Sequence, residues 1–292
     1  MKLHPLYYPD AAAWTAAQAK RVLLFGMSGL GKTHASNMLR SQGQWFHYSI
    51  DYRIGTRYMG ELIADSFKHE AMQVPYLRHL LMTDSIYIAS NITFDNLAPL
   101  SMYLGKPGSA EKGGLPLATY RKRQAEHRSA EIAALQDTPR FIERAQALYA
   151  YDNFVCDSGG SICEVVNPED ADDPVLKTLA ENLLMVWIED TPDHMEELAR
   201  RFDRAPKPMY YDPAFLNESW AAYLADSNLA EDAVDPDDFV RWTYARALSH
   251  RHPRYAAMAR NWGVSVTAQE IAAATTPEAF NQLIAKALER AT

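Results

Sequence analysis

Short apolar runs recur along the chain, separated by longer stretches in which apolar residues have helical spacing. The runs are RVLLF (21–25), WFHYSI (45–50), NFVC (153–156), LLMVWI (183–188) and GVSVT (263–267). Such runs between helices are typical of buried parallel strands, because helices cover both faces of the sheet. The pattern therefore predicts a three-layer α/β protein with a five-stranded parallel sheet.

The spacing of these runs is uneven and predicts helical insertions. About a hundred residues separate the second run from the third, far more than one crossover helix requires. This interval contains a helical stretch at 59–82, the segment LGKPGSAEKGGLP at 104–116 and a charged helix at 118–136. It is either an inserted lobe with a mobile loop or helical padding with a disordered connector. A second insertion, rich in Asp and Trp, runs from about 209 to 248.

These boundaries divide the chain into core and inserted parts. We expect core segments at 1–58, 151–199 and 251–292, the last with the final strand and a C-terminal helix. An inserted lobe at 59–150 is a candidate for substrate binding, and a lid with an insertion occupies 200–250.

The first strand leads into LLFGMSGLGKTHASNMLR (23–40), which matches the phosphate-binding P-loop pattern G-x-x-x-x-G-K-[ST]. Glycines let backbone N–H groups curl around a polyphosphate, and the helix that follows points its positive end at the same anion. Lys32 is expected to reach the β and γ phosphates, and the Thr33 hydroxyl to ligate Mg²⁺. The alternative is an ordinary glycine turn before a helix. The predicted nucleotide contacts are Gly26, Ser28, Gly29, Leu30, Gly31, Lys32, Thr33 and His34.

The second strand ends in SIDYRIGTRY, which places Asp51 at the carboxyl edge of the sheet. Open α/β sheets bind their ligands at this edge. Asp51 could accept a proton from a substrate hydroxyl, and Arg53 or Arg57 could hold a substrate anion. A turn or cap residue is the alternative for Asp51.

The third strand ends in VCDSGG, where Asp157 is the candidate for the magnesium shell. Gly159 and Gly160 would form a turn without side chains, against which a substrate could rest. LMVWIED also ends in acids, so Asp190 is a rival for the magnesium shell. The following TPDHMEELARR instead makes Asp190 or Thr191 resemble a helix N-cap, which we favour.

Four basic residues, Arg200, Arg201, Arg204 and Lys207, lie close together in an otherwise acidic chain. They are either a solvated helix face or the hinge side of a lid. In the lid interpretation Arg204 would oppose the charge that develops on the transferred phosphoryl group.

Several of these features follow one another along the chain: the P-loop, Asp51, the turn at Gly159 and Gly160, the arginine cluster and RHPRY (251–255). In this order they resemble the shikimate kinase and gluconate kinase branch of the P-loop kinases. The resemblance implies a five-stranded parallel sheet with a substrate lobe and a lid. It also implies transfer of the ATP γ-phosphoryl group to a small-molecule hydroxyl, with Arg251 binding an anionic group. The family's third glycine in the turn is absent and Arg53 replaces its second acid, which favours a different or larger acceptor than shikimate.

Lys and Arg total 29 against 37 Asp and Glu, a net charge of −8, which argues against nucleic-acid or anionic-membrane partners. No apolar stretch is long enough to span a membrane and the start lacks a signal peptide, so we expect a cytoplasmic protein. Cys156 and Cys163 fit a reducing compartment and lack zinc-site spacing.

The leading hypothesis is an ATP- and Mg²⁺-dependent kinase that acts on a small, possibly anionic acceptor. The alternative is a P-loop ATPase that acts as a conformational switch or partner-binding module. A GTPase is disfavoured because the guanine-reading motif N-K-x-D is missing from the sequence.

Overall fold

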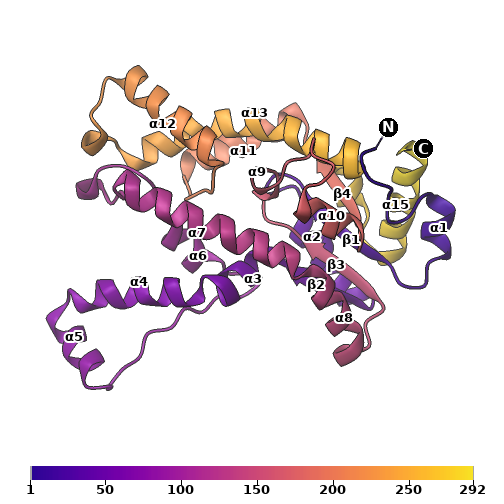
Figure 1. Ribbon diagram of the computed structural model, residues 1–292, viewed down its shortest axis with the longest axis horizontal. Coiled ribbons are helices and arrows are strands. Elements are labelled where there is room, and N and C mark those ends of the chain that lie inside the picture. Colours follow the sequence, from indigo (N-terminus) through magenta and orange to yellow (C-terminus); the bar gives the residue numbers. More distant parts are fainter. Residues whose placement is uncertain (1, 292) are drawn as a thin grey trace. The chain divides into compact units, whose positions relative to one another are not determined.

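Five parallel strands form the central sheet, in the order β2-β3-β1-β4-β5 (Figure 1). Their bounds are Arg21–Phe25 (β1), Trp45–Ser49 (β2), Asn153–Asp157 (β3), Leu184–Glu189 (β4) and Gly263–Thr267 (β5). The predicted α/β class with a five-stranded parallel sheet is therefore confirmed. Because β1 lies between β3 and β4, the carboxyl ends of those two strands flank the loop that follows β1.

The strands are buried almost continuously, as expected of a sheet covered on both faces. Helices α2 (Lys32–Gln42) and α15 (Pro277–Ala291) pack against each other and against the sheet, and so do α8 (Thr138–Tyr149) and α10 (Pro174–Ala180). Right-handed crossovers place these two pairs on opposite faces. The other helices around the sheet are α1 (Ala11–Ala16), α9 (Ile162–Val165), α11 (Pro192–Arg204), α13 (Pro236–Trp262) and α14 (Ala268–Ala273).

The structure, a computed structural model, describes residues 2–291, with the side chains of residues 192 and 193 left out. The chain divides into unit 1, which comprises Met1–Ile50, Ile132–Ala205 and Arg241–Thr292, and unit 2, which comprises Asp51–Glu131 and Pro206–Val240. Unit 1 contains the sheet. Within residues 2–291, no helix combines the length and apolar character needed to cross a bilayer.

Unit 2 is helical, and the predicted helix at 59–82 is divided within it. Helix α4 (Gly60–Met72) ends before Val74, and Pro75 begins α5 (Pro75–Met82). Proline is favoured in the first turn of a helix and disfavours helical backbone in the residue before it, which explains the break. The remaining elements, which lie wholly or mainly in unit 2, are α3 (Ile50–Arg53), a π-helix (Ile54–Tyr58), α6 (Ala98–Leu104), 3₁₀ turns at Ala110–Lys112 and Glu231–Ala233, α7 (Leu117–Gln136) and α12 (Pro213–Ser227).

The glycine-rich segment 104–116 is a folded turn and not a disordered connector. Leu115 accepts a backbone hydrogen bond from Gly108 at 2.9 Å and donates one to Lys106 at 2.8 Å. Ser109 N–H donates to the carbonyl of Val234 at 2.8 Å. A Cβ on Gly108, whose φ is +147°, would lie 2.7 Å from that carbonyl oxygen, so glycine is needed at this close approach.

Candidate nucleotide and phosphoryl-transfer site

The P-loop of unit 1 connects β1 to α2, and its glycines adopt conformations that other residues avoid. Gly26, Gly29 and Gly31 have φ of 139°, 90° and 94°. A Cβ on Gly26 would lie 2.6 Å from the Ile188 carbonyl oxygen of β4, and one on Gly29 would lie 3.0 Å from Leu198 Cδ2 of α11. Positive φ and the close approach of β4 both require glycine here.

Lys32 turns its ammonium group back into this loop. The residue is only 6% exposed, and Nζ donates to the carbonyl oxygens of Gly26 at 2.8 Å and Met27 at 2.9 Å. A buried charge needs such partners because an unpaired one is costly away from water. The ammonium is therefore held inside the loop that the sequence predicts to wrap the phosphates.

The remaining predicted nucleotide contacts lie around the same loop. Leu30 is buried, whereas Ser28 and His34 are exposed. An exposed side chain here is compatible with a role in which the backbone N–H groups hold the phosphates.

Thr33 and Asp157, predicted to share the magnesium shell, are in direct contact. Thr33 Oγ1 donates to Asp157 Oδ2 at 2.7 Å, and Asp157 lies beside Leu24 of β1 in the parallel register. The carboxylate is buried, and His47 Nε2 of β2 lies 3.6 Å from the same oxygen. The site thus gathers a hydroxyl, a carboxylate and an imidazole next to the P-loop.

The oxygen donors of Thr33 and Asp157 fit Mg²⁺, which prefers oxygen ligands. Within the described residues, no group of three or more His, Cys, Asp or Glu side chains could hold a metal ion. Mg²⁺ commonly uses one or two protein ligands together with phosphates and water, so a hydroxyl and one carboxylate suffice for such an ion.

The turn after β3 packs directly on the P-loop. A Cβ on Gly160 would lie 2.4 Å from Ser28 Oγ and 3.2 Å from Ser28 N. The Ser158 hydroxyl donates to the Leu24 carbonyl at 3.1 Å, which holds the start of the turn to β1. Gly160 is therefore required for contact between the turn and the P-loop, a role in addition to the predicted substrate contact of Gly159 and Gly160.

Arg251, predicted to bind an acceptor anion, is buried and paired within unit 1. It is 3% exposed, its Nε donates to Glu164 Oε1 at 2.6 Å, and its Nη1 donates to the Gly160 carbonyl at 3.0 Å. Tyr255 Oη donates to the same carbonyl at 2.6 Å. The buried guanidinium therefore supports the Gly160 turn, and both residues belong to unit 1.

The pKa of Glu164 reflects this pairing. Burial on its own raises the pKa, but the charge of Arg251 and hydrogen bonds from His250 and Arg251 outweigh burial and lower the pKa to about 2. Glu164 is therefore a carboxylate at neutral pH, and the pair is ionised on both sides.

The two candidates for the helix cap after β4, Asp190 and Thr191, have different contacts. Thr191 is the N-cap of α11, and its hydroxyl accepts from His194 N at 3.3 Å. Asp190 is instead buried, with Oδ1 3.0 Å from His252 Nδ1 of α13. The cap is thus Thr191, and Asp190 forms an Asp–His pair just beyond the carboxyl end of β4.

The arginine cluster lies at the end of α11. Arg200 and Arg201 pair with Glu197 at 3.5 Å and 2.7 Å, and Arg204, the last residue of the helix, is exposed. The hydrogen bond from Arg201 and the nearby charges of the other arginines lower the pKa of Glu197. An exposed Arg204 suits both the solvated-face and the lid interpretation.

Asp51, Arg53 and Arg57 belong to unit 2, whereas the P-loop belongs to unit 1. Asp51 is in the first turn of α3, because helix α3 begins directly after β2. The Arg53 guanidinium lies 5.4 Å from the Tyr58 ring centroid, and Arg57 is exposed in the π-helix. Their predicted substrate contacts stay predictions.

The two cysteines are free and fully buried, Cys156 in β3 and Cys163 in α9. Burial raises the pKa of both thiols, that of Cys163 to about 12. Neither thiol is positioned for reactivity, because the thiolate is the reactive form.

Sequence reasoning missed His47, Glu164 and His252. His47 and Glu164 are polar residues inside the apolar runs WFHYSI and SICEVV, a signal of buried polar contacts that could have been used. The pairing of His252 with Asp190 joins residues that are far apart in sequence and had no such signal.

No model of a protein family matches the sequence, and no curated protein matches it. Among solved structures, the chain is similar to shikimate kinase from Bacteroides thetaiotaomicron, with 16% sequence identity and a TM-score of 0.37, over 93% of this chain and 95% of that chain. The strand order and the glycine loop between β1 and α2 decide the fold class. It is an α/β P-loop fold.

Proposed function

We propose that the protein is a phosphotransferase that uses ATP and Mg²⁺ to phosphorylate a hydroxyl group of a small molecule. The observation that carries the proposal is the contact of Thr33 with Asp157 at 2.7 Å, beside a loop that holds the Lys32 ammonium. A phosphate cradle, a cation-binding oxygen pair and a positive charge are the parts that phosphoryl transfer requires.

In this proposal the P-loop backbone and Lys32 bind the β and γ phosphates and orient them. Mg²⁺ would supply charge neutralisation on the phosphate oxygens, and Thr33 and Asp157 would hold it. The acceptor hydroxyl oxygen forms a bond to the γ phosphorus while the bond from that phosphorus to the β–γ bridging oxygen breaks, so ADP leaves.

Two further residues have proposed roles in the same step. Asp51 would accept the proton of the acceptor hydroxyl as a general base. Arg204 would approach the transferred group from the end of α11 and oppose its developing charge. Substrate contacts are proposed for Arg53, Arg57, Gly159 and Gly160.

A P-loop ATPase that drives a conformational switch is the second candidate. It is favoured by the Asp190–His252 pair, because a buried carboxylate can orient an imidazole that positions water. In such an enzyme the proton of the attacking water would pass to His252, and no acceptor would be needed.

One experiment separates the two candidates. ADP release from ATP and Mg²⁺ is measured with a library of hydroxylated metabolites and with a control that lacks any acceptor. A kinase gives turnover that depends strongly on one acceptor and yields a phosphorylated product. Turnover that is equal with and without acceptors contradicts the kinase proposal and supports the ATPase.

A further inference from the structure

The connection from α5 to α6 in unit 2 contains an extended stretch, residues 86–92, with an unpaired backbone (Figure 1). Its sequence is IYIASNI. Among residues 2–291, none forms a hydrogen bond with an N–H or carbonyl group of this stretch. The residues on either side do form such bonds: the Ser85 N–H donates to the Leu80 carbonyl at 2.9 Å, and the Thr93 N–H donates to the Asn96 carbonyl at 3.1 Å. The stretch therefore has the free backbone edges of an unpaired strand.

The side chains of this stretch alternate in exposure with the period of a β-strand. Those of residues 87, 89 and 91 are exposed, and those of residues 86, 88 and 90 are partly buried. Such alternation is typical of a strand with one face against the protein. Ile and Tyr favour strands, and the stretch lacks the proline and charged residues that protect edge strands from pairing. It is therefore suited to pair with another strand.

Helix α5, which precedes this stretch, adds exposed apolar side chains, and we call residues 74–92 the arm. No residue of α5 is buried. Tyr76 and Met82 are 72% and 73% exposed, and Tyr87 is 89% exposed. A tyrosine side chain covers about 150–250 Å² when buried, so these three residues supply roughly half of the ~800 Å² that each partner contributes to a standard interface. Pairing of the strand edge would cover further surface, which gives the arm enough area for a stable contact.

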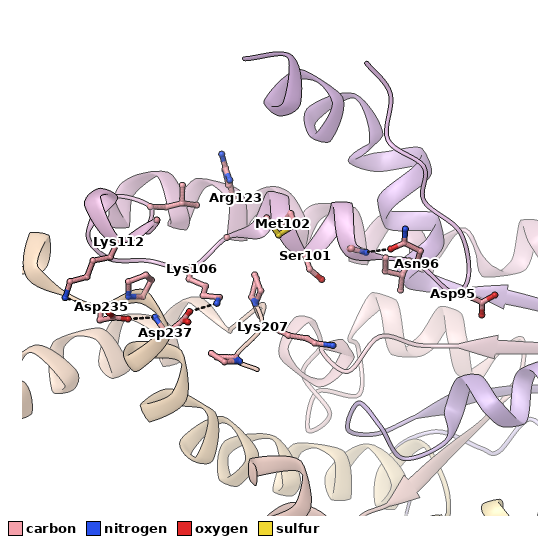
Figure 2. Close-up of a pocket in the computed structure, with 18 residues that line it drawn as sticks. Asp95, Asn96, Ser101, Met102, Lys106, Lys112, Arg123, Lys207, Asp235 and Asp237 are labelled. Atoms are coloured by element: carbon pink, nitrogen blue, oxygen red, sulfur yellow. Dashed lines mark hydrogen bonds and ion pairs between the residues drawn. The ribbon is translucent and has the colours of Figure 1, made fainter. Parts of the chain in front are cut away.

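The arm is nearly uncharged. Apart from His79, its only ionisable acid and base are Arg78 and Asp84, in a chain whose net charge is −8. By contrast, the cavity of unit 2 in Figure 2 is lined by several lysines and aspartates. A nucleic acid or an anionic membrane would be attracted by a basic surface, which the arm lacks. A second copy of the arm would meet it without net repulsion, because each copy offers one charge of either sign.

We propose that two copies of this chain associate through residues 86–92, which pair as antiparallel strands about a twofold axis at Ala89. A twofold contact uses the same patch on both copies, and an axis at the middle residue pairs the whole stretch. Ala89 then lies opposite Ala89 of the partner subunit, and Ile86 opposite Ile92 of the partner subunit. Backbone hydrogen bonds provide affinity, and the paired side chains fix the register. This dimer does not depend on the proposed function.

Association is tested by sedimentation velocity over a range of protein concentrations, where we expect a monomer–dimer equilibrium. Neighbouring N–H groups of an extended chain point to opposite sides, so either Ala89→Pro or Ser90→Pro removes a bond of the ladder. One of these variants should raise the Kd of the dimer by about tenfold or more. Neither removes a hydrogen bond of the monomer, because these two N–H groups have no partner within residues 2–291. Circular dichroism and thermal melting check that both variants fold.

The register is tested by disulfide crosslinking of Ala89→Cys on a non-reducing gel. Opposing Cα atoms of antiparallel strands lie about 4.5–5.5 Å apart, within the range of a disulfide, so this variant should crosslink. Tyr87→Cys is the matched control, because it is also exposed but lies about 13 Å along the strand from its symmetry mate. It should crosslink far less on its own and efficiently when combined with Asn91→Cys. Cys156 and Cys163 are buried and should not take part.

The proposal is overturned if the wild type stays monomeric at all concentrations, which is the result expected if a different protein covers the arm. A dimer that neither proline variant weakens would place the interface elsewhere and would also overturn it. Equal crosslinking of Ala89→Cys and Tyr87→Cys would indicate random collision of exposed thiols and would contradict the paired strands. Concentration-dependent dimerisation that one proline variant weakens, with crosslinking of Ala89→Cys well above that of Tyr87→Cys, supports the proposal.

Discussion

Lys32 combines burial with a full positive charge, and the fold satisfies that charge with two backbone carbonyls of its own loop. In Lys32→Ala we expect turnover to fall by at least ~100-fold, because a preorganised charge at the phosphates is lost. The melting temperature should change little, since the side chain contacts the loop and not the apolar core. Circular dichroism, thermal melting and an ATP turnover assay check this, with the exposed Lys286→Ala as control. Activity like that of wild type would rule out the P-loop assignment.

The contacts of Asp157 and Asp190 predict different effects of removing each charge. Asp157→Asn should strongly lower Mg²⁺-dependent turnover, because the oxygen that Thr33 contacts loses its negative charge. Asp190→Asn keeps an oxygen that can accept from His252, so its main effect should be a loss of about 1 kcal/mol in the free energy of unfolding. Turnover at several Mg²⁺ concentrations and urea unfolding compare the two variants. The opposite ranking would move the magnesium role to Asp190, and loss of acceptor-independent hydrolysis in Asp190→Asn would favour the ATPase.

Gly160 limits what can lie beside the P-loop. In Gly160→Ala the new methyl group would meet Ser28 Oγ at 2.4 Å and Ser28 N at 3.2 Å, so the serine side chain must turn away, the loop backbone must yield slightly and ATP affinity should fall. Removing that oxygen should relieve the closer contact and leave the milder one with Ser28 N, since Ser28 Cβ is at an ordinary 3.5 Å. We therefore expect Ser28→Ala to restore much of the ATP affinity of Gly160→Ala, measured by calorimetry, with Ser28→Ala alone as reference. Equal affinity in Gly160→Ala and wild type would show that this contact does not control the loop.

At the scale of elements, the Glu164–Arg251 pair ties α9 to α13 behind the glycine turn. The pKa of Glu164 is lowered from 4.5 to about 2, so its stabilisation is present above about pH 4.5 and is lost as the pH falls toward 2. The shift corresponds to about 3 kcal/mol of the free energy of unfolding. Denaturant unfolding between pH 2 and pH 7 should show that Glu164→Gln is less stable than wild type above pH 4.5, with the difference shrinking toward pH 2. The exposed Glu278→Gln should give no such pH-dependent difference. A difference that does not vary with pH would contradict the pairing.

Most of the sheet could be predicted from the sequence, because buried parallel strands leave continuous apolar runs. The five predicted strands are present, with ends that differ by one residue at most. The P-loop was predictable because its pattern fixes backbone conformation locally. Local patterns did not separate Asp190 from Thr191 as the cap, since either oxygen suits an N-cap and the choice depends on the contact of Asp190 with His252. The burial of Arg251 likewise depends on Glu164, a partner distant in sequence.

At the scale of the whole molecule, each of the two units is assembled from separate stretches of chain. If Asp51 of unit 2 is the general base, Asp51→Asn should lower phosphoryl transfer by roughly 10²- to 10⁴-fold. ATP affinity should stay nearly unchanged, because a general base acts on the acceptor hydroxyl and not on the nucleotide. Calorimetry with ATP and acceptor kinetics measure the two effects on the same variant, with the exposed Asp152→Asn as control. Equal losses of ATP affinity and turnover would assign Asp51 to the nucleotide site.

The buried thiols of Cys156 and Cys163 give unit 1 an intrinsic reporter of its own opening. Since both side chains are inaccessible and their pKa values are raised, an alkylating reagent can reach them only while the surrounding structure is transiently open. When reclosing is faster than alkylation, the labelling rate gives the opening equilibrium around β3 without an added fluorophore. Any nucleotide that binds the closed form alone must slow that labelling in proportion to its occupancy. The labelling rate of these thiols can therefore be used to screen for ligands of the P-loop before the phosphoryl acceptor is known.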